Sequence, residues 1–91
     1  MTFTKWNLMF SETSLKDLKK LQIQDRQRIV HYLEDRVCAN QNPRELGKAT
    51  KGDLSGLWRY RVGDYRIIAD IQDKDIVINV VRVGHRKNIY T

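Results

Sequence analysis

A tight β-hairpin is the feature of this sequence that most restricts its fold. Gly63-Asp64 is a glycine-first dipeptide, which suits the type II′ turn of two-residue hairpins. The flanking segments, residues 57–62 and 65–68, are rich in aromatic and β-branched side chains that favour strands. Because a two-residue turn fixes the register of the two strands, we expect Val62 to lie opposite Tyr65.

This register gathers three arginines on one face of the hairpin. Arg61 would lie opposite Arg66. Arg59, opposite Ile68, points to the same side as Arg61 because side chains alternate along a strand. The other face would carry Trp58, Tyr60, Val62, Tyr65 and Ile67. Like charges placed opposite one another destabilise a sheet, so the arrangement predicts a polyanionic partner. Phosphate is the favoured anion, since the planar guanidinium fork matches it.

Hydrophobic periodicity before the hairpin predicts a strand and two helices. Residues 4–10 alternate between apolar and polar side chains, which is typical of a strand with one buried face. Residues 11–14 offer helix N-caps, and Asp25 offers another before the next helical stretch. The apolar stripe of the first helix is Leu15, Leu18 and Leu21, and that of the second is Ile29, Leu33 and Val37. The segment 40–43 ends the second helix, because Pro43 cannot continue it.

The rest of the sequence predicts a meander with a basic tail. Residues 44–56 are expected to form a loop, and a turn at 73–75 precedes a β-branched run over 76–83 that is typical of a central strand. Residues 84–91 would leave the sheet. This order predicts an α+β fold, in which an N-terminal strand and a helical hairpin precede a three-stranded antiparallel meander. The helices would cover one face of the sheet and leave the arginine face open. The helical residues expected to meet the apolar face of the hairpin are Leu15, Leu18, Ile29 and Leu33.

Size and composition limit the class of protein. The 91 residues are expected to form one domain, 1–91. A net charge of +6 favours a nucleic acid or an acidic protein as the partner. The single cysteine, Cys38, rules out an internal disulfide framework, and no Cys/His cluster has metal-ligand spacing. Since the sequence has neither a membrane-spanning apolar run nor a signal peptide, we expect a cytoplasmic protein without a membrane partner.

Basic and aromatic residues of the hairpin and the tail suit phosphodiester chemistry. The candidates are Arg59, Arg61, Arg66 and Arg86 as a phosphate clamp, His85 for proton transfer and Tyr90 for base stacking. The sequence has no carboxylate cluster at metal-site spacing, so we expect cleavage without a metal or cofactor. RNA is then the expected substrate, because its 2′-hydroxyl supplies the nucleophile. Each candidate also has a simpler interpretation without a function. The arginines could form a solvated or acid-paired face, His85 could be an ordinary surface histidine, and Tyr90 could be a frayed residue near the chain end.

Three segments resemble the RelE branch of the RelE/ParE toxin superfamily: 42–49 (NPRELGKA), 56–68 (GLWRYRVGDYRII) and 83–90 (VGHRKNIY). The resemblance covers essentially the whole chain. It implies a bacterial or archaeal type II toxin that a RelB-like antitoxin wraps and neutralises. Characterised members of the family enter the ribosomal A site and cut mRNA there. The 2′-hydroxyl attacks the adjacent phosphate, which leaves a cyclic phosphate and a free 5′-hydroxyl.

The resemblance also implies roles for individual residues. Arg59 and Arg61 match two strand lysines of the family, and Arg66 matches the arginine that stabilises the phosphate. Arg86 matches the arginine proposed to protonate the leaving group. Tyr90 matches the tyrosine that stacks on the mRNA base.

One departure from the family pattern leaves the general base open. Arginine stays protonated where lysine can lose its proton, so Arg59 and Arg61 are expected to hold phosphate and not to accept a proton. His85 and Tyr90 are the candidates for the base. The leading hypothesis is a ribosome-dependent mRNA endonuclease, an mRNA interferase that inhibits translation.

Two other functions fit the same residues. A ParE-like toxin would poison DNA gyrase by binding, and its toxicity would survive the loss of Arg66 and Arg86. A non-catalytic module would use the arginine face to dock an acidic partner.

Overall fold

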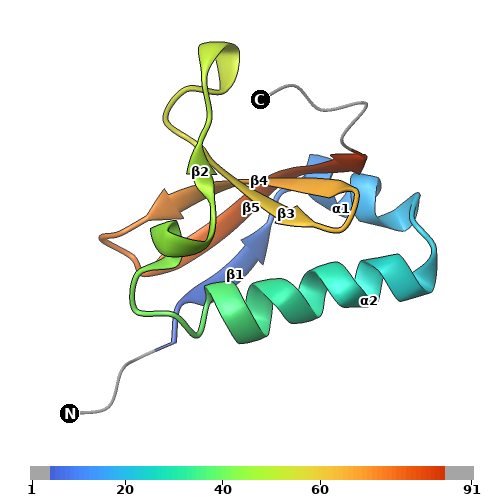
Figure 1. Cartoon of the computed structure of the whole chain (residues 1–91), viewed down its shortest axis with the longest axis horizontal. Coiled ribbons are helices and arrows are strands. Elements are labelled where there is room, and N and C mark those ends of the chain that lie inside the picture. Colours follow the sequence, from blue (N-terminus) through green and yellow to red (C-terminus); the bar gives the residue numbers. More distant parts are fainter. Residues whose placement is uncertain (1–4, 86–91) are drawn as a thin grey trace.

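The chain folds into a mixed β-sheet with helices on one side. The computed structural model describes residues 5–85. The elements are β1 (Asn7–Phe10), α1 (Glu12–Lys19), α2 (Ile23–Tyr32), a π-helical turn (Leu33–Val37), a 3-10 turn (Pro43–Leu46), β2 (Lys48–Ala49), a second 3-10 turn (Gly52–Leu54), β3 (Trp58–Val62), β4 (Tyr65–Gln72) and β5 (Val77–His85) (Figure 1). The described residues form a five-stranded sheet in the order β1-β5-β4-β3-β2, in which β1 pairs parallel to β5 and the other pairs are antiparallel. The predicted α+β class is confirmed.

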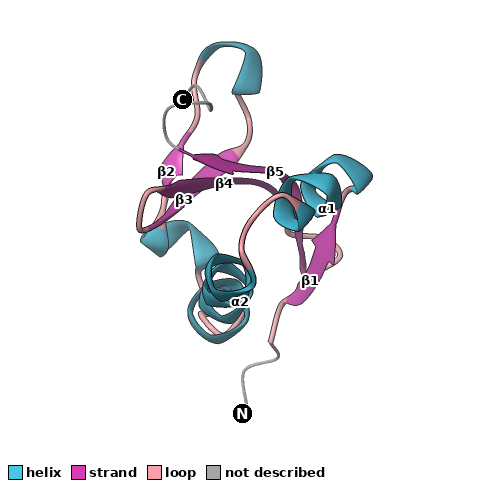
Figure 2. Cartoon of the chain, turned by 90° about the vertical axis from the view of Figure 1, so that its right-hand side faces the viewer, coloured by secondary structure: helices cyan, strands magenta, loops and turns pink. Residues whose placement is uncertain are grey.

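One apolar core joins the helices to the sheet. In Figure 2, α2 lies beneath the strands, and α1 lies beside β5 and β1. The predicted stripe of α2 and its π-helical extension is confirmed, since Ile29, Leu33 and Val37 are fully buried. The buried partners on the sheet are Tyr60, Val62, Ile67, Ala69, Ile78, Val80 and Val83. The opposite face of the β3–β4 hairpin, which carries the arginines, is therefore left without a helix.

The hairpin has the predicted turn and register. Gly63 has a φ of +58°, which a glycine at the first position of a type II′ turn adopts without strain. Val62 pairs with Tyr65, and Arg61 pairs with Arg66. The tight turn therefore places the arginines where the sequence predicted them.

Strand β5 starts one residue later than predicted, and its register against β4, for which no prediction was made, contains a shift. The turn before it spans residues 73–76, so Ile76 lies in the turn and not in the strand, with a φ of +54°. Further along, the β4–β5 ladder shifts register between Ile68 and Ala69, because Ile68 pairs with Arg82 and Ala69 pairs with Val80. The extra residue on β5 lets Val80 and Val83, three residues apart, both enter the core.

Helix α1 buries only part of its predicted stripe, since Leu18 lies in the core and Leu21 packs against it. Leu15 is 45% exposed, whereas Ser14, Asp17 and Leu18 are buried. Polar residues occupy these positions because they satisfy main-chain groups. The Ser14 hydroxyl donates to the Ser11 carbonyl at 2.9 Å. Leu15 was therefore a wrong core prediction.

The helix caps agree with the prediction for α1 and differ for α2. Ser11 is the N-cap of α1, and its hydroxyl accepts a hydrogen bond from the Ser14 N–H at 3.1 Å. The N-cap of α2 is Gln22, not the predicted Asp25. Asp25 instead lies in the first turn and accepts a hydrogen bond from the Tyr65 hydroxyl at 3.1 Å. This bond ties α2 to the first residue of β4.

Asp17 joins α1 to β5. One of its carboxylate oxygens accepts hydrogen bonds from the Val83 main-chain N–H and from Nε of Arg82, both at 2.9 Å. The Asp17 residue is only 9% exposed. A carboxylate in this position satisfies a buried strand amide that no neighbouring strand reaches.

Replacing Asp17 with alanine is expected to lower the free energy of unfolding by about 2–3 kcal/mol, because the buried Val83 amide and Arg82 would lose their acceptor. Asp53→Ala, at an exposed position of the second 3-10 turn, is the control and should change stability by less than about 0.5 kcal/mol. Urea unfolding followed by circular dichroism measures both. Equal stability of the two variants would contradict this role for Asp17.

Candidate functional site

Three arginines from the β3–β4 hairpin line one pocket. Arg59 and Arg61 of β3 and Arg66 of β4 share a pocket of about 340 Å³, which we call the arginine pocket. Its other lining residues are Glu45, Leu46, Gly47 and Lys48. The predicted convergence of the three arginines on the face away from the helices is confirmed. A concave basic surface of this kind fits a phosphate better than a flat charged face does.

The second wall of the pocket comes from a segment whose structure the sequence did not predict. Residues 44–56 were expected to form a loop. They instead contain β2 and the 3-10 turn Gly52–Leu54, and they begin within the 3-10 turn Pro43–Leu46. Lys48 of β2 pairs directly with Arg59 of β3. Since paired residues of neighbouring strands point to the same face, Lys48 joins the arginines. A strand of two residues has too little alternation for a sequence pattern to reveal it.

Three contacts hold this wall against the sheet. The buried Tyr60 hydroxyl donates to the Pro43 carbonyl at 2.8 Å. Arg44 donates two hydrogen bonds to the carboxylate of Asp73, from Nη1 to Oδ1 at 2.9 Å and from Nη2 to Oδ2 at 2.8 Å. The hydrogen bond from Arg44 lowers the pKa of Asp73 below its usual value, and burial raises the pKa of Tyr60. Both groups therefore keep these hydrogen-bonding states at neutral pH.

The third contact is the close approach of Gly47 to β3. A Cβ atom on Gly47 would lie 2.3 Å from the Arg59 carbonyl oxygen and 2.8 Å from Cδ1 of Trp58. The φ of Gly47 is −138°, which any residue adopts, so the need for glycine is one of space. Glycine lets the chain from the 3-10 turn into β2 lie directly on β3.

Two cations of the arginine pocket, Arg59 and Arg61, take part in no salt bridge among the described residues. Within residues 5–85, the salt bridges join Arg44 to Asp73 and Arg82 to Asp17, so neither Arg59 nor Arg61 takes part in one. Glu45 is the acidic residue that lines the pocket. The positive charge of Arg59 and Arg61 is therefore available to an external anion.

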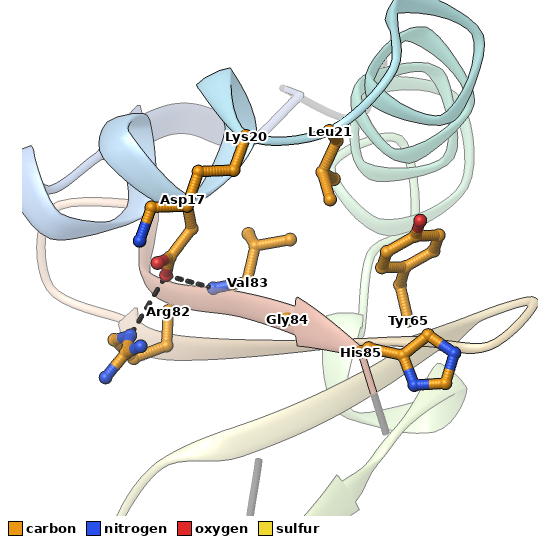
Figure 3. Close-up of a pocket in the computed structure, with 8 residues that line it drawn as sticks. All are labelled: Asp17, Lys20, Leu21, Tyr65, Arg82, Val83, Gly84 and His85. Atoms are coloured by element: carbon orange, nitrogen blue, oxygen red, sulfur yellow. Dashed lines mark hydrogen bonds and ion pairs between the residues drawn. The ribbon is translucent and has the colours of Figure 1, made fainter. Parts of the chain in front are cut away.

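His85 lies on the other face of the sheet. The sequence had suggested that His85 belongs to a tail outside the sheet, but it is the last described residue of β5. It pairs with Tyr65, and the two rings meet edge to face with centroids 5.8 Å apart and planes at 78°. Figure 3 shows both rings in a second pocket, of about 310 Å³, with Asp17 and Lys20 of the α1 end. The structure thus does not bring His85 together with the arginine pocket.

The other candidate residues do not contribute to the arginine pocket as the structure describes it. Arg86 and Tyr90 lie outside the described residues. Cys38 is buried, and burial raises the pKa of its thiol to about 11, so the thiol stays protonated at neutral pH. Among residues 5–85, no group of three or more His, Cys, Asp or Glu side chains is arranged to hold a metal ion. In the same part of the chain, no helix has both the length and the apolar character to cross a membrane.

Comparisons with known proteins point to one group of toxins. A family model described as the ParE toxin of the type II toxin–antitoxin system parDE matches residues 8–90. Toxin RelE3 of Methanocaldococcus jannaschii is 35% identical over 86 residues, which cover 91% of this chain and 93% of that protein. Toxin RelG of Mycobacterium tuberculosis is 28% identical over 85 residues, with 93% and 95% covered. The toxin–antitoxin complex RelBE2 of M. tuberculosis contains a chain with a TM-score of 0.83, 25% identity and coverage of 96% of this chain and 98% of its own.

Proposed function

The chain belongs to the RelE/ParE family of toxins from type II toxin–antitoxin systems, and we propose that it is a RelE-type, ribosome-dependent mRNA endonuclease. The observation that carries the proposal is the arginine pocket, in which Arg59, Arg61 and Arg66 face one cavity. Guanidinium groups bind phosphate through paired hydrogen bonds and stabilise the charge that develops on it during cleavage. The pocket therefore supplies what an RNA substrate with its own nucleophile needs from an enzyme.

The proposed reaction is an attack within the RNA. The 2′-oxygen bonds to the neighbouring phosphorus as a base takes the hydroxyl proton, and the bond from phosphorus to the 5′-oxygen breaks. The departing 5′-oxygen gains a proton, so the products are a 2′,3′-cyclic phosphate and a 5′-hydroxyl. We assign Arg59 and Arg61 to binding the phosphate and Arg66 to its developing charge. By resemblance to the family, Arg86 would protonate the leaving oxygen and Tyr90 would stack on a base.

We propose an acidic, RelB-like antitoxin as the partner. The similar chain of M. tuberculosis was solved within a toxin–antitoxin complex. The present chain carries a net charge of +6, which favours an acidic partner. An acidic segment that folds onto the toxin would cover the arginine pocket and exclude RNA. The proposed setting, with ribosomes and mRNA, is the cytoplasm.

The second candidate function is poisoning of DNA gyrase. It is favoured by the matching family model, which describes a ParE toxin. In this case the basic face would bind its target without cutting RNA.

A cleavage assay separates the two functions. Purified protein is added to ribosomes that hold a defined mRNA with an empty A site, to the same mRNA without ribosomes, and to gyrase with plasmid DNA. We expect cuts only in the ribosome-bound mRNA. Intact mRNA together with gyrase trapped on cleaved plasmid would support the gyrase poison instead, and intact mRNA and plasmid would leave a non-catalytic module.

A further inference from the structure

We propose that Lys48 is the general base of the reaction, the residue that takes the proton from the attacking 2′-hydroxyl. The inference rests on the proposed RNA cleavage and adds a catalytic residue to it. Arg59 and Arg61 cannot fill this role, because a guanidinium keeps its proton across the working range of pH. Lysine, in contrast, can lose its proton, and the neutral amine can then accept one from a substrate.

The β2–β3 pairing places Lys48 beside the phosphate clamp. Lys48 lies directly opposite Arg59, and Arg61 is two residues further along the same strand and on the same face. Directly paired residues have Cβ atoms about 5 Å apart, and residues two apart along a strand are separated by about 7 Å. A phosphate held by Arg61 and Arg66 is therefore within reach of the flexible Lys48 side chain. Lys48 is exposed and lines the same cavity.

Contacts of the residues before Lys48 hold β2 against β3 and the preceding turn in place. Gly47 packs against the main chain of β3 immediately before Lys48. The turn before it is fixed by the Tyr60–Pro43 hydrogen bond and by the paired hydrogen bonds from Arg44 to Asp73. A general base must be held within hydrogen-bonding reach of the proton that it abstracts. The rigid attachment of β2 to β3 meets this requirement.

The neutral amine of Lys48 accepts the proton of the 2′-hydroxyl and becomes an ammonium, while the 2′-oxygen bonds to phosphorus. The electron pair of the broken P–O bond stays on the 5′-oxygen, which is protonated from another donor. The ammonium of Lys48 returns its proton to solvent before the next cut.

Glu45 is the competing base in the same cavity. Its carboxylate lines the arginine pocket beside Lys48. We favour Lys48 because it pairs with Arg59 on the strand ladder, whereas Glu45 belongs to the preceding turn. Glu45→Gln removes the carboxylate charge and therefore separates the two candidate bases.

The test compares single-turnover cleavage of ribosome-bound mRNA by wild type, Lys48→Met, Lys48→Arg and Glu45→Gln. Lys51→Met is the matched control, since Lys51 is exposed in the same segment and does not line the arginine pocket. We expect both Lys48 variants to cut at least about 100-fold more slowly, the range of a lost general base, and the control to cut at the normal rate. Urea unfolding midpoints should be equal for all variants.

Each contrary result has a distinct meaning. Normal cleavage by Lys48→Arg would overturn the inference alone, because the charge and not proton transfer would then matter. A loss confined to Glu45→Gln would make Glu45 the base and also overturn it. No cleavage by the wild type would overturn the proposed function as well.

Two further measurements locate the missing proton transfer. A small primary amine in solution should accelerate cleavage by Lys48→Ala, and no acceleration would count against the inference. An mRNA with sulfur in place of the bridging 5′-oxygen has a leaving group that needs no proton. It should restore cleavage by Arg86→Ala but not by Lys48→Met. Restoration with Lys48→Met would assign Lys48 to the leaving group and contradict its role as the base.

Discussion

Replacing Arg66 with alanine is expected to slow the cleavage of ribosome-bound mRNA by about 100- to 1000-fold, the usual loss when one group that stabilises transition-state charge is removed. Arg66 is the contribution of β4 to the arginine pocket and lies directly opposite Arg61. Its loss leaves the phosphate held from β3 alone. Single-turnover rates at saturating protein measure the effect on the chemical step.

Two variants make this result specific. Lys74→Ala removes a positive charge from the exposed turn between β4 and β5 and should leave the rate unchanged. Arg66→Lys keeps the charge but loses the planar fork, so it should fall between wild type and Arg66→Ala. If Arg66→Ala cuts as fast as Lys74→Ala, the pocket does not stabilise the reacting phosphate.

Replacing Gly47 with alanine is expected to lower both the stability and the cleavage rate. The added methyl group would lie 2.3 Å from the Arg59 carbonyl, so β2 must move away from β3. Overpacking of this kind costs about 1–3 kcal/mol. The movement would also carry Lys48 away from the arginines, so we expect cleavage to fall at least about tenfold at a temperature where the variant is folded.

Gly52→Ala is the matched control for this loss. Gly52 has a left-handed φ of +66°, but no atom lies within 4 Å of a Cβ placed there. It should therefore lose about 1 kcal/mol of stability through backbone strain while its cleavage rate stays normal. Urea unfolding and single-turnover cleavage measure both variants. Normal cleavage by folded Gly47→Ala would show that the position of β2 does not matter to the reaction.

Local signals were sufficient for the central hairpin. A glycine-first turn sets the register, and alternation then assigns each side chain to a face, so Arg59, Arg61 and Arg66 could be placed together from the sequence alone. The Ser11 cap and the apolar stripe of α2 are local for the same reason, because their signals lie within a few residues of each other.

The sequence predictions failed where distant contacts decide the structure. Asp17 is buried because Val83, on another element, offers an amide, and this contact turns α1 so that Leu15 faces solvent. Lys48 belongs to the arginine pocket because β2, a strand of two residues, pairs with β3. Gly47 packs against β3, and Arg44 binds Asp73 in the turn before β5, and these contacts hold β2 in place. His85 was predicted to join the arginines, but it lies on the opposite face of the sheet because β5 continues through it and pairs it with Tyr65.

The chemical ends of the cut mRNA test the central claim most directly. Ribosome-bound mRNA is treated with wild-type protein, and the fragments are analysed by mass spectrometry and by their labelling with polynucleotide kinase. The proposed mechanism predicts a 2′,3′-cyclic phosphate on the upstream fragment and a 5′-hydroxyl on the downstream fragment. A 5′-phosphate with a 3′-hydroxyl, or uncut mRNA, would contradict cleavage by the 2′-hydroxyl within the arginine pocket.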